Sequence, residues 1–281
     1  MKSIGIIGVG FVGGAVKQGM SHAFEIYSYD KQKGYLYPTG EGLVHSDRFD
    51  WILQKTDGPI FVCVPTPMDI DGTCYTVIVE DVVRDIDEAA KWNTTSARTI
   101  IIKSTVPPGT TERFNAQAKR IHICFNPEFL TERLAVQDFK NQTRIIIGGS
   151  AEATSIVKSM YQIAYPQVPV IETSSTIAEM VKYITNTFLS VKVSFANEIK
   201  MLCDKLDINY DKTIECAMKD SRLGDSHWSV PGPDGQIGFG GSCFPKDLSA
   251  LLNLAEQLSI ECKTMQGAWD TNISIRPPKI T

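Results

Sequence analysis

Residues 2–13 read Lys-Ser-Ile-Gly-Ile-Ile-Gly-Val-Gly-Phe-Val-Gly. The apolar run at 2–7 predicts a short buried strand, and the glycines that follow predict a tight turn opening a helix. A second apolar run, 24–29, ends in Asp30. A strand, a glycine turn, a helix and a second strand ending in an acid form the pattern of a dinucleotide-binding unit.

Each glycine of this turn has its own physical role. Gly8 permits the tight turn, Gly10 lets a pyrophosphate approach the backbone, and Gly13 lets the helix pack against the strand. The phosphates would meet free N–H groups at the helix N-terminus, and Asp30 would accept a hydrogen bond from a ribose hydroxyl. That carboxylate favours NAD over NADP, because it repels a 2′-phosphate. A glycine turn without a ligand is the plainer alternative. The predicted cofactor contacts are Gly8, Gly10, Phe11, Val12, Gly13 and Asp30.

Short β-branched runs alternate with helix-like segments further along the chain. The strands are expected at 59–64, 99–103, 121–125 and 144–147, and the helices at 76–92, 109–119 and 151–163. This alternation predicts an α/β, Rossmann-like, doubly wound parallel sheet over residues 1–173. Ligands of such sheets bind beyond the carboxyl ends of the strands.

Three of those strand ends carry polar, proline-bearing turns, at 64–67, 103–109 and 125–132. Proline and glycine punctuate strand ends in any case, so each turn alone could be ordinary. Three such turns on the edge that binds ligands are more than ordinary chain reversal requires, which favours a ligand site there. The cofactor contacts expected in these turns are Pro65, Thr66, Ser104, Thr105 and Glu132.

Residues 174–281 read as an all-helical domain. A long helical pattern runs over 174–206 and places Lys182 and Asn186 one turn apart on one face. A solvated lysine and asparagine are the alternative by spacing alone. The same helix carries an apolar stripe suited to self-association, formed by Ile184, Phe188, Val191, Phe195 and Ile199. Further helices are expected at 211–219, after Cys243 and from about Lys263.

Residues 238–247 read Gly-Phe-Gly-Gly-Ser-Cys-Phe-Pro-Lys-Asp. Pro245 suits the first turn of a helix, which would place Cys243 just before a helix N-terminus with Lys246 one turn away. Free backbone N–H groups and an ammonium depress the pKa of a cysteine, so the pattern predicts a thiolate. An ordinary half-buried cysteine beside a glycine loop is the alternative.

Composition narrows the classes of function. The 281 residues have a net charge of −4, which indicates no general affinity for nucleic acid or membrane. Seven scattered cysteines without a Cys-x-x-Cys pair fit a reducing cytoplasm, and four separated histidines form no metal-ligand spacing. No apolar run approaches the length of a membrane span. We therefore expect a cytoplasmic protein without a metal.

Read in order, several motifs resemble the UDP-glucose 6-dehydrogenase family, whose relatives are UDP-N-acetylmannosamine and GDP-mannose dehydrogenases. The resemblance covers nearly the whole chain. Its motifs are Gly8–Gly13, Ser104-Thr-Val-Pro-Pro-Gly, Asn126-Pro-Glu-Phe-Leu-x-Glu, Lys182-x-x-x-Asn186 and Gly240-Gly-Ser-Cys-Phe-Pro-Lys-Asp247. Family enzymes oxidise the C6 alcohol of a nucleotide sugar to a carboxylate in two hydride transfers, with two NAD and one thiol.

The resemblance implies a role for each matching residue. Cys243 would capture the aldehyde as a thiohemiacetal, which is oxidised to a thioester and hydrolysed by water. Lys182 and Asn186 would stabilise the developing oxyanion. Asp247 and Thr105 would hold a water for proton transfer.

Two further acids and an arginine also match. Glu128 would be the general base for thioester hydrolysis, and Glu132 matches a second family acid that could be structural. Arg222 matches an arginine that family members lend to a neighbouring subunit, which implies a homodimer with a shared active site. Lys246 joins the expected cofactor contacts. The expected substrate contacts are Phe129, Leu130, Lys182, Asn186, Arg222, Phe239 and Gly240.

The chain departs from the family in its length. Family enzymes continue into a third, α/β domain that closes over the nucleotide, and this sequence ends where that domain would begin. The resemblance thus implies a form without the third domain, acting on UDP-glucose or a related nucleotide sugar. Two alternatives stay open: a truncated paralogue that binds NAD or modulates a full-length partner, and a simpler hydroxyacid-type dehydrogenase.

Overall fold

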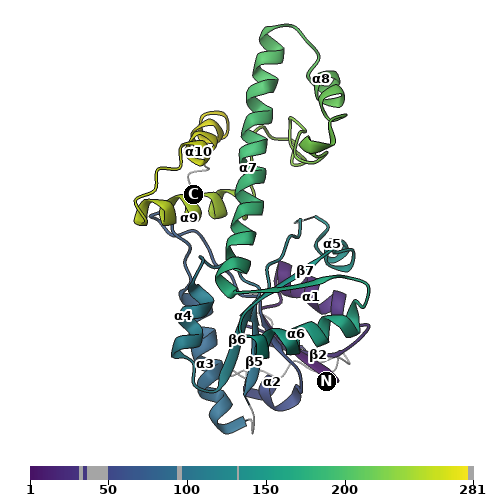
Figure 1. Cartoon of the computed structure of the whole chain (residues 1–281), viewed down its shortest axis with the longest axis vertical. Helices are drawn as coiled ribbons and strands as arrows, with labels where there is room; N and C mark the ends of the chain where they lie inside the picture. Colours follow the sequence, from purple (N-terminus) through teal and green to yellow (C-terminus); the bar gives the residue numbers. More distant parts are fainter. Residues whose placement is uncertain (32–33, 37–49, 94–96, 132, 278–281) are drawn as a thin grey trace. The chain divides into compact units, whose positions relative to one another are not determined.

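A computed structural model describes residues 1–31, 34–36, 50–93, 97–131 and 133–277 (Figure 1). The chain forms two compact units. The amino-terminal unit comprises Met1–Pro67 and Tyr75–Lys182, and the carboxyl-terminal unit comprises Met68–Cys74 and Tyr183–Thr281. The units divide after Lys182, whereas the sequence pattern placed a domain boundary after residue 173. That domain assignment stays a prediction.

In its described residues, the amino-terminal unit is built on one eight-stranded sheet with the strand order β3-β2-β1-β4-β5-β6-β7-β8. The predicted Rossmann-like α/β fold is confirmed, because β1 pairs in parallel with β2 and β4, and β5 pairs in parallel with β4 and β6. The strands are β1 (Ser3–Ile7), β2 (Glu25–Asp30), β3 (Gly34–Leu36), β4 (Ile60–Val62), β5 (Arg98–Ile102), β6 (Ile121–Phe125), β7 (Ile145–Gly148) and β8 (Val170–Thr173).

Two of the pairings within this mostly parallel sheet are antiparallel. β3 runs antiparallel to β2, and β7 runs antiparallel to β6. A single backbone pair among the described residues, Phe125 with Gly148, joins β6 to β7. Beyond it the Asn126 side chain donates to the Ile146 carbonyl at 2.7 Å. Pro127 follows and has no N–H group for a ladder, so a side chain continues the pairing there.

Helices cover both faces of the sheet, and the strands alternate between two cores. On β5, Ile101 belongs to the core beneath α1 (Phe11–Met20), α5 (Ala135–Lys140) and α6 (Ala151–Ala164). Ile100 and Ile102 belong to the core beneath α2 (Asp50–Lys55), α3 (Val77–Asn93) and α4 (Thr110–Gln117). Successive apolar residues of a strand therefore lie on opposite faces of the sheet and pack against two layers of helices, as a doubly wound sheet requires.

The carboxyl-terminal unit is helical, as the sequence predicted. Its helices are most of α7 (Ser175–Lys205), α8 (Tyr210–Ala217), the short 3-10 helix η1 (Ser221–Leu223), α9 (Phe244–Gln257) and α10 (Lys263–Ile275). A small core of Ala196, Cys203, Tyr210, Ile214 and Trp228 joins α7 to α8 and the loop after η1. Among the described residues, no helix combines the length and the apolar character needed to cross a bilayer.

Candidate active site

The glycine turn of the amino-terminal unit has the geometry expected of a phosphate-binding loop. Gly8 has a φ of +88°, and a Cβ on Gly13 would lie 1.8 Å from the Gly8 carbonyl oxygen. A Cβ on Gly10 would meet no atom within 4 Å, so the backbone there borders open space. Gly10 is also the N-cap residue of α1, whose end has no side-chain cap. This glycine and the helix N-terminus can therefore receive a pyrophosphate.

Asp30 takes part in the turn itself. Its Oδ2 accepts a hydrogen bond from the Val9 N–H at 2.7 Å, and the Gly8 N–H donates to the Tyr29 carbonyl at 2.8 Å. The carboxylate expected at the ribose thus also ties the end of β2 to the turn after β1. Two further expected contacts lie in the first turn of α1: Phe11 is exposed and Val12 is half-buried.

The turns after β4 and β5 are joined to one another. Ser104 Oγ donates to the Val64 carbonyl at 2.7 Å. Thr66, Ser104 and Thr105 are buried, whereas Pro65 is exposed. The structure therefore brings these predicted residues together at the carboxyl edge of the parallel strands, where the glycine turn also lies.

A buried network behind these turns was not predicted from the sequence. Lys103 Nζ lies 2.9 Å from Asn126 Oδ1, and the Tyr161 hydroxyl donates to the same oxygen at 2.6 Å. Burial lowers the pKa of Lys103 to about 8, although Cys63 and Glu128 partly oppose the shift. The available signal was a lysine at the end of an otherwise apolar strand.

Glu128 and Lys182 form a buried ion pair. Lys182 Nζ lies 2.6 Å from Glu128 Oε1, both side chains are at most 5% exposed, and the Leu130 N–H donates to Glu128 Oε2 at 2.7 Å. Burial by itself raises the pKa of Glu128, but the Lys182 ammonium and the Leu130 N–H outweigh it. That pKa therefore lies below its usual range, and the carboxylate is ionised at neutral pH.

Two residues expected at the substrate adjoin this pair. The half-buried Phe129 ring lies close to two cations, with the Arg144 guanidinium 4.7 Å and Lys182 Nζ 5.9 Å from its centroid. Leu130 is half-buried and contributes the N–H that binds Glu128. Glu132, the remaining predicted acid of this segment, lies outside the described residues.

In the carboxyl-terminal unit, Cys243 is the N-cap residue of α9, as the sequence predicted. Its thiol is half-buried and lies 3.7 Å from Ser242 Oγ. One turn further on, the Asp247 N–H donates to the Cys243 carbonyl at 2.9 Å. The cysteine therefore stands at the N-terminus of α9, where the first backbone N–H groups of a helix have no intrahelical partner.

Asp247 organises the polar side chains around this helix end. It is 1% exposed, accepts from Asn186 Nδ2 at 2.6 Å and lies 2.5 Å from Lys246 Nζ. Asn186 is buried on α7, so the contact joins α7 to α9 within the unit. Thr105 belongs to the other unit, and its expected cooperation with Asp247 stays a prediction.

The glycine loop before Cys243 is buried at Gly238 and Phe239, and side chains from other parts of the unit bind it there. Phe239 is 3% exposed and Gly240 is half-buried. Asn272 of α10 binds the backbone of Phe239 through both atoms of its amide. This asparagine was not predicted as a site residue, because nothing in its local pattern separates it from a surface residue.

Arg222 is not brought to the other predicted residues of its unit. Its side chain is 86% exposed and forms an ion pair with Asp220, two residues away. The contacts of this guanidinium within its own unit therefore do not indicate which ligand or site it serves.

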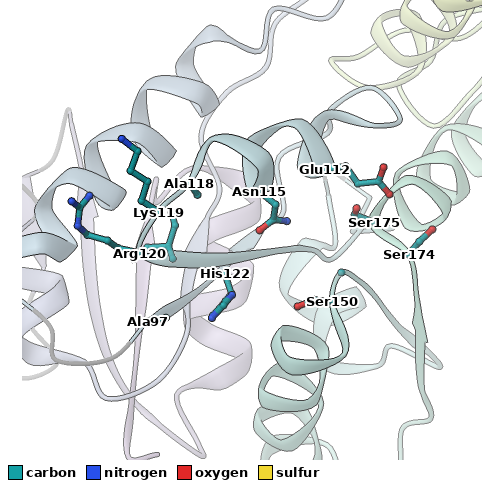
Figure 2. Close-up of a pocket in the computed structure, with 12 residues that line it drawn as sticks. Ala97, Glu112, Asn115, Ala118, Lys119, Arg120, His122, Ser150, Ser174 and Ser175 are labelled. Carbon is teal, nitrogen blue, oxygen red and sulfur yellow. The ribbon is translucent and has the colours of Figure 1, made fainter.

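The pocket shown in Figure 2 lies elsewhere in the amino-terminal unit. It has a volume of about 580 Å³ and adjoins the start of β6, residues 149–150 just before α6, and the start of α7. Its described lining, which includes His122, Ser150 and Ser175, contains no predicted site residue. It lies at the amino ends of β5 and β6, opposite the edge of the glycine turn. No cluster of three His, Cys, Asp or Glu side chains suited to a metal ion occurs among the described residues.

The amino-terminal unit has a doubly wound sheet with a glycine turn, and its β2 ends in an aspartate. The helical unit that follows carries a thiol at a helix N-terminus. Together these features define the class of two-unit, NAD-binding dehydrogenases. Two models of one family match the chain. The NAD binding domain of the UDP-glucose/GDP-mannose dehydrogenase family matches residues 44–165, and its central domain matches residues 176–274. The chain belongs to the UDP-glucose/GDP-mannose dehydrogenase family.

Individual relatives agree with this assignment. The UDP-glucose 6-dehydrogenase of Rickettsia typhi is 35% identical over 224 residues, which cover 78% of this chain and 49% of that protein. UDP-glucose 6-dehydrogenase TuaD of Bacillus subtilis is 33% identical over 221 residues, with 76% and 46% covered. A solved UDP-glucose dehydrogenase of Pyrobaculum islandicum superposes with a TM-score of 0.85 at 28% identity, covering 98% of this chain and 68% of that one.

The chain spans about half the length of the curated relatives it matches. The cofactor of the amino-terminal unit is NAD, by its match to the family's NAD binding domain. The residues fit that cofactor, because Gly10 leaves room above the helix N-terminus and Asp30 stands at the end of β2.

Proposed function

We propose that the chain oxidises a nucleotide sugar at C6 by four electrons, with NAD as hydride acceptor. UDP-glucose is the proposed substrate and UDP-glucuronate the product, because the relatives above are named UDP-glucose 6-dehydrogenases. The observation that carries the proposal is Cys243 at the N-terminus of α9, with Asp247 one turn away held by Asn186 and Lys246. A dehydrogenase that stops at an aldehyde or ketone has no use for this thiol.

The first oxidation converts the C6 alcohol to an aldehyde. The hydroxyl loses its proton to a water held by Asp247 and Thr105, and the carbon loses a hydride. Bound NAD supplies the acceptor for this hydride and, as a second molecule, for the next one. Asp247 suits the task because two donors fix its carboxylate in one orientation.

The second oxidation needs covalent capture. The Cys243 thiolate adds to the aldehyde carbon and forms a thiohemiacetal, whose oxyanion Lys182 and Asn186 stabilise. Loss of a hydride from that carbon gives a thioester. Both donors are buried, and a buried ammonium or amide stabilises a developing negative charge more strongly than one in water.

Hydrolysis completes the reaction. Glu128 takes a proton from a water, the water oxygen adds to the thioester carbon, and the C–S bond breaks to return the thiol. Its lowered pKa keeps Glu128 in the base form at neutral pH. In sum, one alcohol, two NAD and one water give one carboxylate, two NADH and three protons.

The test is NADH appearance with a panel of UDP- and GDP-sugars, counted per sugar consumed. We expect two NADH per sugar with UDP-glucose. One NADH per sugar would indicate a simple alcohol dehydrogenase. NAD binding without turnover on any sugar would favour a binding role as a truncated paralogue, an alternative suggested by the half-length match to the curated relatives.

We propose further that two copies associate through the apolar stripe of α7. Ile184, Phe188 and Phe195 are 56%, 65% and 50% exposed, which is unusual for three large apolar side chains on one helix face. Arg222 would then serve the site of the neighbouring copy, which agrees with its exposed guanidinium. Seven free cysteines support a reducing, cytoplasmic location.

Mixing two inactive variants tests the shared site. A Cys243→Ser protein supplies an intact Arg222, and an Arg222→Ala protein supplies an intact Cys243. Random reassortment into dimers gives one complete site in each mixed dimer, so about a quarter of the wild-type rate should return. A monomer in solution, or no recovered rate after mixing, contradicts the shared site and leaves the thiol chemistry untouched.

A further inference from the structure

The loop before Cys243 has its main chain held by side chains from two helices. The Gly238 N–H donates to Asn197 Oδ1 at 3.1 Å, and the Phe239 N–H donates to Asn272 Oδ1 at 2.7 Å. Asn272 Nδ2 donates to the Phe239 carbonyl at 3.0 Å, and Arg276 Nη1 donates to the Gly238 carbonyl at 3.5 Å. Four consecutive backbone groups are thus satisfied, which favours one conformation of the loop.

Two glycines of this loop, Gly238 and Gly240, are explained by the same side chains. Gly238 has a φ of +69°, and a Cβ on it would lie 2.5 Å from Asn272 Oδ1. A Cβ on Gly240 would lie 2.3 Å from the Arg276 guanidinium. The loop is therefore shaped to admit two side chains against its backbone, Asn272 of α10 and Arg276 at its C-cap.

Aromatic packing connects the held segment to the cysteine. The buried Phe239 ring meets the Phe244 ring edge to face, with centroids 6.4 Å apart. Phe244 is the first residue of α9 and follows Cys243 directly. The backbone at Phe239 and the start of α9 are thus linked through two rings as well as through the chain.

We infer that Asn272 is a positioning residue for Cys243, acting by its two hydrogen bonds to the Phe239 backbone and through the Phe239–Phe244 contact. Asn272 is 6% exposed, and its two hydrogen bonds use both the donor and the acceptor of its amide. A side-chain amide carries a donor and an acceptor side by side, so in this orientation it satisfies an N–H and a carbonyl of one residue together. The catalytic consequence rests on the proposed function, whereas the placement of the thiol can be measured without it.

The test compares Asn272→Asp with a matched control, Asn253→Asp. Asn253 of α9 donates to the Ser249 carbonyl of its own helix. In Asn272→Asp a carboxylate oxygen replaces the donor and faces the Phe239 carbonyl, so the hydrogen bond to that carbonyl is lost while the side-chain volume is kept. The readouts are site-resolved alkylation of Cys243 by iodoacetamide, with the exposed Cys216 as internal standard, and steady-state kinetics.

We expect the ratio of Cys243 to Cys216 alkylation rates to change about threefold or more in Asn272→Asp and to stay unchanged in the control. With a sugar that the wild-type protein oxidises, kcat should fall about tenfold or more, because small misplacements of reacting groups slow the chemical step strongly. The KM for NAD should stay the same. A purely structural role would instead change both parameters and both thiols.

A second variant protects the test against misfolding. Arg276→Leu removes a bond to the Gly238 carbonyl from a side chain that is 25% exposed, and its effect should run in the same direction and be smaller. An unchanged alkylation ratio in both variants, with faster hydrogen exchange at Gly238 and Phe239, overturns the inference. An altered ratio in a protein that oxidises no sugar supports the positioning role and contradicts the proposed function alone.

Discussion

The two glycine segments of the molecule use the same residue for different physical reasons. In the turn of the amino-terminal unit, a Cβ on Gly13 would lie 1.8 Å from the backbone oxygen of Gly8. In the loop of the carboxyl-terminal unit, a Cβ on Gly240 would lie 2.3 Å from the Arg276 guanidinium. A long side chain can move aside, whereas a carbonyl in a helix-to-strand contact cannot move without rebuilding the turn.

This difference separates two ways of building a ligand site. The amino-terminal unit presents backbone groups, so its recognition is contained in a few consecutive residues. The carboxyl-terminal unit presents side chains from α7 and α9 and stabilises them with α10. Changes in the first should affect NAD binding, and changes in the second should affect the chemistry while NAD binding persists.

The largest effect is expected from Cys243→Ser. A hydroxyl has no accessible anion at neutral pH, so acid formation should fall about 10³-fold or more. NAD affinity should stay at the wild-type value, because the glycine turn belongs to the other unit. Product analysis and NAD titration check both statements, and a serine variant that still releases two NADH per sugar would rule out covalent capture.

A pair of glycine substitutions tests the comparison directly. Gly13→Ala should weaken NAD binding about 100-fold, since the helix N-terminus is displaced from the phosphates. Gly240→Ala should leave NAD affinity unchanged and lower kcat less than about tenfold, because the Arg276 side chain can rotate away. Calorimetric titration and initial rates measure these effects. Similar losses of NAD affinity in the two variants would refute the distinction.

The buried Lys103 should make the stability of the protein depend on alkaline pH. Its pKa is about 8 in the folded protein, against an ordinary value of 10.5. Between these values the unfolded chain binds more protons, so the free energy of unfolding rises with pH. From pH 7.5 to 9.5 the wild type should gain about 2 kcal/mol more than Lys103→Met. Urea unfolding at the two pH values checks this, and equal pH slopes in both proteins would show that Lys103 is not desolvated.

The smallest effect concerns cofactor choice. The Asp30 carboxylate should favour NAD over NADP by about tenfold or more, through repulsion of the 2′-phosphate. Asp30→Asn removes the charge and keeps an oxygen that can accept from the Val9 N–H, so the turn should persist while the preference shrinks. Initial rates with both cofactors measure it. Equal use of NADP by the wild type would contradict the assigned role of Asp30.

Local pattern was enough for much of the fold. The glycine turn, Asp30, the alternating segments and the long helix followed from periods of two and of 3.6 residues and from motifs of consecutive residues. The helix after Cys243 was also foreseeable, because Pro245 marks a first turn. The six-residue helices α2 and α5, the short strands β3 and β8, and the reversed direction of β7 were not foreseen. Such segments are too short for a period to appear, and their conformation depends on what they pack against.

The sequence by itself determined which chemical groups this protein carries: a dinucleotide turn, a thiol before a helix, and an amine and an amide one turn apart on α7. The tertiary structure alone decided their partners. Lys182 pairs with Glu128, 54 residues away, and Asn186 pairs with Asp247, 61 residues away. Asn272 reaches Phe239 across 33 residues. A hydrogen bond depends on separations of about 3 Å between atoms, and sequence periodicity carries no information about distances between remote segments.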